Sequence, residues 1–598
     1  MSICYLLSGK NCDTILTITV GGSDMYTFDE LKSFCKADAT QLKPVRLALL
    51  GDCATQHLAK ALRGTGYTHG YNIDMFDADY NQISAQVLDA SSELYAHSPD
   101  FTLIFMCVEK LYDSWCDTPE EQRAQFAETT LGLIVSYWSA MQSHTKSRII
   151  QYNFIEHEDN IFGSFGARIK TSFRYQLKKL NLLLGDAAAE HGVYIADIDA
   201  IAHDKGRSNV IDDKLYYIAK MPFSTDFLPY AAECVFKIVD AVSGRFKKCC
   251  VLDLDNTLWG GVIGDDGLDG IEIGELGRGH AFTDLQKWLK ELKKRGILLA
   301  VCSKNNEDAA KEPFLKHPEM VLRLEDFSIF VANWQDKASN IRTIQQVLNI
   351  GMDSLVFIDD NPFERNTVRS LIPDITVPEL PEDPAEYLEF LKQQNLFETA
   401  SYSSEDAGRT DQYRAEAGRV MSQASFGSFD EYLQSLDMVA EAKPFDAFHF
   451  PRIAQLTQRS NQFNLRTVRY SEDEIAAIAA DDSHITLYFT LKDKFGDNGL
   501  ISVVILDKCA DSTLFISEWL MSCRVLKRGM EEFIINTIVE TAHKNGYKAV
   551  IGEYIKTAKN AMVADIYERL GFTPDTGRFV CNTNAFKPLK TFIKSDEE

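Results

Sequence analysis

The sequence lacks the marks of membrane-spanning, secreted and nucleic-acid-binding proteins. No run approaches the ~20 consecutive apolar residues of a membrane helix, so we expect no membrane insertion. The first residues, MSICYLLSGKNCD, have neither a basic segment nor a long apolar stretch, which argues against a signal peptide. No Lys/Arg cluster stands out in a chain of formal net charge -25, which would repel a nucleic acid.

The chain also lacks any CxxC pair, although it contains 13 cysteines. Several cysteines stand inside apolar runs, such as Cys107 in TLIFMCVEK. This pattern indicates free thiols in a reducing compartment, the cytoplasm, and not a disulfide framework. It gives no support to a cysteine-based metal site either.

Three patterns follow one another along the 598 residues, and together they predict three α/β domains. Over 1–243, short apolar runs alternate with amphipathic stretches, as in buried parallel strands separated by helices. Near-continuous apolar strands mark a second domain over 244–400. Over 401–598, two strands around Gly-Asp-Asn-Gly at 496–499 predict an antiparallel hairpin, and helices are expected at 528–546 and 559–571.

Two carboxylates follow the first apolar strand of the second domain, in VLDLDNTLWGG. Asp253 and Asp255 stand two residues apart as the chain leaves this strand. Such carboxylates repel each other unless a cation lies between them, and Mg²⁺ prefers hard oxygen ligands. A metal-held carboxylate can attack phosphorus, and its neighbour can then protonate the leaving oxygen.

The next strand ends supply what this chemistry still needs. Ser303 offers a hydroxyl for a phosphoryl oxygen, Lys337 follows Asn333 and offers a cation, and Asp359-Asp360 offer further carboxylates. In an open α/β sheet such strand ends converge at the carboxyl edge. A surface loop would explain any one of these motifs, but four in this order predict a magnesium-dependent phosphoryl-transfer site.

These residues resemble the haloacid-dehalogenase superfamily, and DLDNTLWGGVIGDDG, SKN, ANW and FIDDNPFER resemble its FkbH-like branch, subfamily IIIC. The resemblance implies that Asp253 is the nucleophile and Asp255 the acid/base. It implies a metal set of Asp253, Asp255, Asp359 and Asp360. It implies that the phosphate is held by Ser303, Lys337, Thr257, Asn305 and Asn333.

The stretch CRVLKRGMEEF at 523–533 follows an apolar strand and opens a helix, where backbone N–H groups can hold a pyrophosphate. Together with TAKNAMVADIYERLGF it resembles the GCN5-related N-acetyltransferase (GNAT) fold, which implies coenzyme A or carrier-bound phosphopantetheine. The resemblance implies phosphate contacts by Arg528 and Gly529, a thioester contact by Asn560 and a general acid in Tyr567. Only one glycine of the usual loop is clear, so an ordinary strand–helix junction with a packed tyrosine is the alternative.

The segment RIAQLTQRSNQFNLRT at 452–467 also resembles the FkbH-like family. Its polar side chains are expected either to line a substrate pocket or to form a solvated helix face. These side chains are Gln455, Gln458, Asn461, Gln462 and Asn464.

LALLGDCATQ at 47–56 resembles the first block of SGNH-type esterases, with Cys53 where a serine would stand. A cysteine at a helix N-terminus can act as a nucleophile, here as a covalent acyl carrier. Tyr216 stands where the esterase base is expected after Asp213, so a structural domain with a buried Cys53 is the alternative. Cys302, beside Ser303, is a rival thiol.

The whole chain resembles a long FkbH-like protein with SGNH-like (1–243), haloacid-dehalogenase-like (244–400) and GNAT-like (401–598) domains. The resemblance implies that 1,3-bisphosphoglycerate, a small phosphorylated three-carbon compound, is converted to a glyceryl thioester and loaded on an acyl carrier protein. Two alternatives stay open. One is an acyltransferase that modifies a surface polysaccharide or amino sugar, and the other is a phosphatase with non-catalytic flanking domains.

Overall fold

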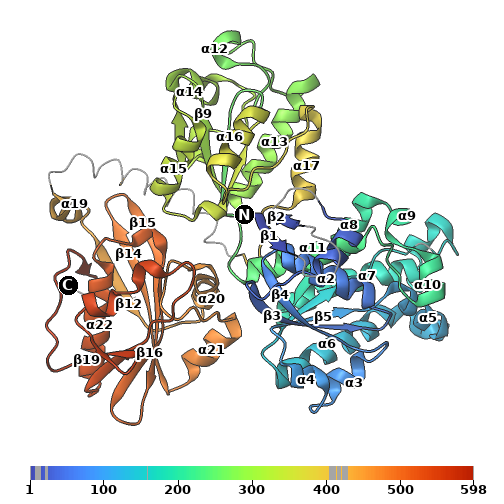
Figure 1. The fold of residues 1–598 in the computed structure, drawn as a ribbon, viewed down its shortest axis with the longest axis horizontal. Coiled ribbons are helices and arrows are strands. Elements are labelled where there is room, and N and C mark those ends of the chain that lie inside the picture. The colour runs from blue at the N-terminus through green and yellow to red at the C-terminus, as the bar shows by residue number, and fades with distance from the viewer. Residues whose placement is uncertain are drawn as a thin grey trace. The chain divides into compact units, whose positions relative to one another are not determined.

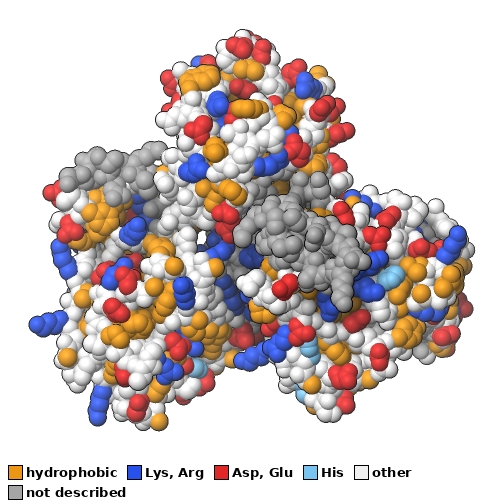
Figure 2. Space-filling model, in the orientation of Figure 1, with side chains coloured by type: hydrophobic (Ala, Val, Ile, Leu, Met, Phe, Trp, Pro, Cys, Tyr) orange, Lys and Arg blue, Asp and Glu red, His pale blue; other side chains and the backbone are white. Residues whose placement is uncertain are grey.

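The computed structural model describes residues 2–6, 15–19, 25–157, 159–402, 413, 419 and 428–596. The chain forms two compact units, Met1–Ala241 and Val242–Glu598. Each described hydrophobic cluster takes its residues from one unit. Among the described helices, none combines the length and the hydrophobicity of a membrane span. Figure 2 shows acidic and basic side chains interspersed over the visible face.

The first unit is built on a parallel sheet with the strand order β4-β3-β5-β6-β7. These strands are Tyr71–Asp77, Lys43–Gly51, Phe101–Phe105, Arg148–Tyr152 and Tyr194–Ala196, respectively. β5 is buried along its whole length, because helices cover both faces of the sheet. Figure 1 shows α2 (Gln56–Thr68) and α11 (Leu228–Val242) on one face and α6 (Phe126–His144) on the other.

Local signals set the helix ends in this unit. In α7 (Phe173–His191), the side chain of Ser172 accepts a hydrogen bond from Tyr175 N at the start, and Gly192 adopts the left-handed conformation at the end. The remaining elements are β1 (Ser2–Leu6), β2 (Ile15–Thr19), α1 (Phe28–Phe34), α3 (Ile83–Leu88), α4 (Glu93–His97), α5 (Val108–Asp117), α8 (Ile198–Lys205), α9 (Arg207–Val210) and α10 (Asp213–Ala219).

The second unit begins with a parallel sheet in the order β10-β9-β8-β11. Its strands are Ile329–Ala332, Leu298–Ser303, Cys249–Leu252 and Leu355–Ile358, respectively. Alternate residues of β8 enter two separate cores, Cys250 and Leu252 on one face and Cys249 and Val251 on the other. The helices are α12 (Ile263–Asp266), α13 (Gly277–Lys294), α14 (Glu307–Lys316), α15 (Lys337–Leu348), α16 (Pro362–Leu371) and α17 (Tyr387–Gln394).

A mixed sheet follows in the same unit, in the order β18-β19-β17-β16-β15-β14-β12-β20, with β13 beside β16. β16 and β17 are parallel, whereas β14, β15 and β16 are antiparallel. The strands are β12 (Val439–Lys443), β13 (Phe463–Asn464), β14 (His484–Asp493), β15 (Gly496–Lys508), β16 (Thr513–Met521), β17 (Ala549–Gly552), β18 (Thr573–Asp575), β19 (Arg578–Asn582) and β20 (Lys594–Ser595). The helices are α19 (Phe429–Ser435), α20 (Phe450–Arg459), α21 (Glu472–Ala480), α22 (Met530–Lys544) and α23 (Ile566–Arg569).

The α/β fold class is thus confirmed, but two predicted local elements differ. The Gly-Asp-Asn-Gly sequence lies inside β15, and the hairpin turns earlier, between Asp493 and Gly496. The carboxylate of Asp493 accepts a hydrogen bond from Phe495 N, 2.8 Å away, which stabilises this earlier turn. The pairing register of β14 and β15 shifts just before the turn. Sequence alternation does not reveal such a shift, so the prediction placed the turn too late.

The helix predicted over 559–571 is reduced to a 3₁₀ turn, Ala561–Val563, and the short α23. Asn560 is the physical reason, because its side chain bonds to the backbone of Ile555 and Thr557 and so competes with helix formation. Gly571 ends the segment with positive φ, as the sequence suggests.

Candidate active site

The carboxyl ends of β8 and β11 bring a lysine and three carboxylates together. Asp253 follows β8, Asp359 and Asp360 follow β11, and Lys337 opens α15. Lys337 Nζ lies 2.8 Å from Asp253 Oδ2 and also contacts Asp359 Oδ2. Asp253, Lys337 and Asp359 are 7%, 4% and 0% exposed, so water screens this pair of contacts poorly.

Burial and charge act against each other on these groups. Burial disfavours the ammonium of Lys337, but the carboxylates of Asp253 and Asp359 outweigh it and raise the pKa of Lys337. Burial and the negative charge of Asp253 raise the pKa of Asp359, against the opposing effect of Lys337. The negative charge of the carboxylates in this cluster therefore exceeds the positive charge of Lys337.

The residues fit a divalent cation. One ligand oxygen each from Asp253, Asp359 and Asp360 lies within 4.8 Å of the other two. Oδ1 of Asp253 is buried and has no hydrogen-bond partner among the described residues. Three carboxylates face one ammonium, and a Mg²⁺ ion would balance the remaining two negative charges with the ligand type it prefers.

Asp255 is held in place beside this cluster. Its Oδ1 accepts hydrogen bonds from Trp259 Nε1 and Ile263 N, both 3.0 Å long, and its Oδ2 accepts one from Asn305 Nδ2 at 2.9 Å. Burial raises the pKa of Asp255, although the hydrogen bonds from Ile263 N and Trp259 lower it. A carboxyl group with a raised pKa is suited to proton transfer at neutral pH.

The predicted phosphate ligands surround the same sheet edge. Ser303 ends β9 and is buried, and its carbonyl oxygen accepts a hydrogen bond of 3.1 Å from Asn333 N. The side chain of Asn333 exchanges hydrogen bonds with Asn340 in α15. Thr257 Oγ1 accepts a hydrogen bond from Asp360 N at 3.1 Å and lies 3.3 Å from Asp360 Oδ1.

Two side chains that support this cluster were missed by sequence reasoning. Arg365 Nη1 donates to the carbonyl oxygens of Asp359 and Asp360 at 2.9 and 2.6 Å, and so holds the turn that carries both carboxylates. Trp259 is fully buried and orients Asp255. Both belong to motifs that the sequence analysis quoted, but their roles depend on side-chain directions that spacing does not reveal.

In the first unit, Cys53 lies in the turn between β3 and α2. It is 1% exposed, and one ligand atom each of Asp52, Cys53 and Cys107 lies within 4.8 Å of the others. Asp52 Oδ1 accepts a hydrogen bond of 2.9 Å from Cys107 N, and burial raises the pKa of Asp52 to about 6. Cys107 was not predicted as a site residue, because its separation from Cys53 along the sequence does not indicate that the two thiols lie close together. Tyr216, the residue in the place of the esterase base, is buried, and burial raises its pKa.

Cys302, the rival thiol, is buried in the core, with its Sγ 3.7 Å from the carbonyl oxygen of Lys337. Burial raises the pKa of the Cys302 thiol well above its ordinary value.

The predicted GNAT-like residues are engaged within their own part of the second unit. Arg528 is buried, and its Nη1 lies 3.2 Å from Asp493 Oδ2. Gly529 has a φ of 81° and is the residue directly before α22. Asn560 Nδ2 donates to the carbonyl oxygens of Asn464 and Ile555, at 2.9 Å each. Tyr567 is 1% exposed, and burial raises its pKa.

Known proteins resemble this chain as follows. The family model described as "FkbH, N-terminal domain" matches residues 46–240. The crystal structure of the N-terminal part of the protein BF1531 from Bacteroides fragilis, containing a phosphatase domain complexed with Mg, is 48% identical with a TM-score of 0.61. The similarity covers 63% of this chain and 100% of that one. The chain belongs to the FkbH-like family of haloacid-dehalogenase phosphatases.

This FkbH-like chain matches no curated protein. Among solved structures, the ribosomal-protein-S18-alanine N-acetyltransferase from Escherichia coli is 17% identical to this chain. The similarity covers 24% of this chain and 89% of that one, with a TM-score of 0.18. This chain is 13% identical to the spermidine N-acetyltransferase from Vibrio cholerae in complex with CoA and spermine, over 25% of this chain and 96% of that chain at a TM-score of 0.20. The roles of the residues predicted from the SGNH and GNAT resemblances stay predictions.

Proposed function

We propose that this FkbH-like chain removes a phosphoryl group from a phosphorylated three-carbon acyl compound and transfers the acyl group through a thioester to a carrier protein. The observation that carries the phosphatase part is the cluster of the buried residues Asp253, Lys337 and Asp359 with the half-buried Asp360. Such a cluster favours an anionic phosphoryl group once a divalent cation has neutralised it.

Each residue has a defined task in the phosphoryl transfer. Asp253 attacks phosphorus with one carboxylate oxygen, and the bond from phosphorus to the glyceryl oxygen breaks. Asp255 gives its proton to the departing alcohol and then takes one from the water that hydrolyses the aspartyl phosphate. Ser303 and Lys337 hold the phosphoryl oxygens through a hydroxyl and a charge-assisted hydrogen bond.

Asp253, Asp359 and Asp360, with Asp255 beside them, are the residues that would hold Mg²⁺. When bound, the ion supplies charge neutralisation for the phosphoryl oxygens.

In the acyl step, a thiolate attacks the C1 carbonyl of 1,3-bisphosphoglycerate. The C–S bond forms, the C–O bond to the C1 phosphate breaks, and inorganic phosphate leaves. After Asp253 has removed the C3 phosphate, the thiol of a carrier-bound phosphopantetheine attacks the glyceryl carbonyl. A new C–S bond forms, the C–S bond to the first thiol breaks, and the first thiolate leaves and takes up the proton lost by the pantetheine thiol. Cys53 is our candidate for the first thiol, because it stands at the carboxyl edge of a parallel sheet, where α/β proteins place ligands. In this scheme the residues predicted from the GNAT resemblance serve the final transfer: Arg528 and Gly529 as phosphate contacts, Asn560 as the thioester contact and Tyr567 as the general acid.

The test is intact-mass measurement of the purified full chain after incubation with Mg²⁺ and 1,3-bisphosphoglycerate generated in place. We expect a glyceryl adduct on the wild type and a phosphoglyceryl adduct on Asp253→Asn, because that variant cannot remove the second phosphate. Cys53→Ala should lose the adduct, whereas Cys302→Ala should keep it.

The other outcomes separate the alternatives. An adduct that survives in Cys53→Ala and disappears in Cys107→Ala would move the acyl site to the neighbouring thiol. Phosphate release that depends on Asp253, without any adduct, would reject acyl loading and leave a phosphatase with non-catalytic flanking domains. An adduct that passes to an amino sugar and not to a carrier protein would favour the surface-polysaccharide alternative.

A further inference from the structure

A buried thiol that attacks an acyl phosphate needs a group that takes up its proton, and the proposed function leaves this group open for Cys53. Tyr216 stands in the place of the esterase base, but it is buried, and burial raises its pKa. A tyrosine hydroxyl with an ordinary pKa of about 10 already keeps its proton at neutral pH. The proton acceptor is therefore a different group.

Asp52 and Cys107 lie close together because they follow neighbouring strands. β3 and β5 are parallel, and they end at the paired residues Gly51 and Phe105. Asp52 N donates a hydrogen bond of 3.2 Å to the carbonyl oxygen of Phe105, and Asp52 Oδ1 accepts one of 2.9 Å from Cys107 N. These two bonds hold the carboxylate at the carboxyl edge of the sheet, where α/β proteins place ligands.

The carboxylate of Asp52 lies beside two thiols. One of its oxygens and the sulfur atoms of Cys53 and Cys107 all lie within 4.8 Å of one another, and all three residues are buried. Proton transfer needs a hydrogen-bond contact, which catalytic groups often complete only when the substrate is bound. A shift of about 1–2 Å brings a sulfur into such contact with the carboxylate.

The two thiols are not equivalent. A hydrogen bond to Cys53, burial and the negative charge of Asp52 raise the pKa of Cys107 well above its ordinary value. Cys107 therefore keeps its proton and stabilises a thiolate on Cys53 by donating to it. Of the two thiols, Cys53 is the one that attacks.

The surroundings of Asp52 suit a proton acceptor. Burial raises the pKa of Asp52 to about 6, although the hydrogen bond from Cys107 N and the charge of Lys110 lower it. A carboxylate with such a pKa is mostly ionised at neutral pH and is a stronger base than an ordinary aspartate. The titratable and charged groups around this turn come from the turn itself, from α5 with the residue before it, and from the end of β4: Cys53, Cys107, Glu109, Lys110 and Asp77.

We propose that Asp52 is the catalytic base of the acyl step and takes up the proton of the Cys53 thiol, an inference that rests on the acyl part of the proposed function. As the C–S bond forms, the S–H proton moves to Asp52, the C–O bond to the C1 phosphate breaks, and phosphate leaves with the electron pair of that bond. Asp52 then releases the proton to water. In the second transfer Asp52 takes the proton of the pantetheine thiol and returns it to the sulfur of Cys53 as that sulfur leaves.

The rate of adduct formation tests the proposal, measured by intact mass on the full chain with excess 1,3-bisphosphoglycerate generated in place, from about pH 5 to about pH 8. We expect the wild-type rate to rise as Asp52 ionises near pH 6 and then to level off. Asp52→Asn keeps an oxygen for Cys107 N but cannot take up a proton. Its rate should be about 10²-fold lower at pH 7 and should rise about tenfold per pH unit with the thiolate fraction. The matched control is Asp79→Asn, an exposed carboxylate after β4.

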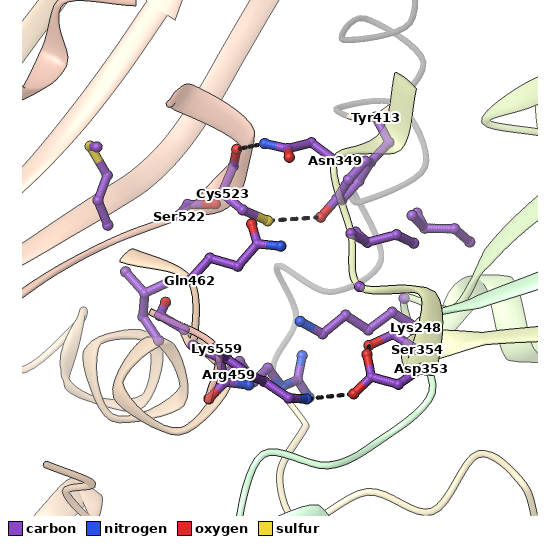
Figure 3. Close-up of a pocket in the computed structure, with 18 of the residues that line it drawn as sticks. Lys248, Asn349, Asp353, Ser354, Tyr413, Arg459, Gln462, Ser522, Cys523 and Lys559 are labelled. Atoms are coloured by element: carbon purple, nitrogen blue, oxygen red, sulfur yellow. Dashed lines mark hydrogen bonds and ion pairs between the residues drawn. The ribbon is translucent and has the colours of Figure 1, made fainter. Parts of the chain in front are cut away.

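Alkylation by iodoacetamide, followed peptide by peptide, tests Asp52 without an acyl donor. We expect Cys53 to react at least about tenfold more slowly at pH 7 in Asp52→Asn than in the wild type. If Asp52 were only a neighbouring negative charge, its removal would favour the thiolate and speed the reaction. The internal control is Cys523, a half-buried thiol of the second unit whose Sγ lies 4.0 Å from Tyr413 Oη (Figure 3).

Two results would overturn the proposal where the wild type forms an adduct. One is a folded Asp52→Asn variant, checked by circular dichroism, with the wild-type rate and pH profile. The other is zinc that copurifies with the wild type and not with Cys53→Ala, because a carboxylate bound to a metal cannot take up the proton.

Where the wild type forms no adduct, the acyl part of the proposed function fails and alkylation decides about Asp52. Slower alkylation of Cys53 in Asp52→Asn would then support the proton transfer. Equal or faster alkylation, or a wild-type Cys53 that does not react at all, would overturn it.

Discussion

The carboxylate of Asp253 has one oxygen paired with Lys337 and the other buried without a partner among the described residues. Asp253→Asn keeps the shape of the side chain but removes the nucleophilic charge. We expect phosphate release from a phosphomonoester to fall by at least about 10³-fold. Single-turnover phosphate release measures this, with Asp265→Asn, an exposed change in α12, as the control. Activity within tenfold of the wild type would show that Asp253 is not the nucleophile.

Lys337 is the ammonium group that contacts both Asp253 and Asp359. Lys337→Met leaves these buried carboxylates to repel each other, and removal of one partner from a buried pair costs about 3–5 kcal/mol. We therefore expect the variant to unfold at lower urea concentration than the wild type in EDTA. Because Mg²⁺ relieves the repulsion, it should raise the unfolding midpoint of the variant more than that of the wild type. Equal increments for the two proteins would contradict a metal at this cluster.

At the scale of elements, α11 is tied to the end of α2 through an imidazole. His69 follows α2, and its Nδ1 and Nε2 lie 2.7 and 2.9 Å from carboxylates of Asp240 and Glu233 in α11. Burial disfavours the imidazolium, but the two carboxylates outweigh it and raise the pKa of His69 to about 10. The pKa of His69 in the folded protein exceeds its unfolded value of about 6.5. The charged His69 therefore contributes its full stabilisation below about pH 6.5, and this contribution disappears as the pH rises through about 10.

We predict that His69→Gln lowers the free energy of unfolding of the first unit at pH 7. The difference in this free energy between the variant and the wild type, called the gap below, should narrow towards pH 10. The gap should shrink by at most about 1.4 kcal/mol per pH unit. Pulse proteolysis in urea, with peptides of the first unit followed by mass spectrometry, measures it. A gap of constant size from pH 7 to pH 10 would rule out a charged His69 as its cause.

The contact between α1 and α2 depends on Gly64. A Cβ built on Gly64 would lie 2.4 Å from the carbonyl oxygen of Leu31 in α1, and backbone cannot move away as a side chain does. We expect Gly64→Ala to destabilise the first unit by about 1–3 kcal/mol. Gly185→Ala in α7 is the control, because its Cβ meets no atom within 4 Å and alanine favours the helix by up to about 1 kcal/mol. Destabilisation of the same size by both changes would mean that the α1 contact is not the cause.

At the scale of the whole molecule, the phosphatase cluster lies entirely in Val242–Glu598, and the Cys53 cluster in Met1–Ala241. The described hydrophobic clusters do not mix residues of the two units. We predict that a fragment spanning 242–598 folds and hydrolyses a small phosphomonoester within about tenfold of the full chain, because a self-contained core can fold alone. The fragment should form no acyl adduct. A folded but inactive fragment would show that the first unit completes the phosphatase site.

The positions of the phosphatase residues could be predicted because each signal is local. An apolar run predicts a buried strand, and a polar residue directly after it, such as Asp253 or Asp359, must lie at the carboxyl edge of a parallel sheet. The same reasoning misplaced the turn near Asp493 and overextended the helix after Asn560. At both places a side chain makes hydrogen bonds to the nearby backbone, and these bonds favour a turn over the strand or helix that the sequence pattern predicts.

Sequence alone therefore determined the fold class, the parallel sheets and the polar residues, such as Asp253 and Asp359, that gather at a carboxyl edge, since hydrophobic periodicity and strand ends are properties of neighbouring residues. Only the tertiary structure decided that Cys107 lies beside Cys53 and that His69 is held between two carboxylates. These partners are far apart along the chain, and no local pattern encodes their distance. They meet because separate helices and strands pack their apolar faces on common cores. This packing brings polar side chains on different elements close together, where they interact.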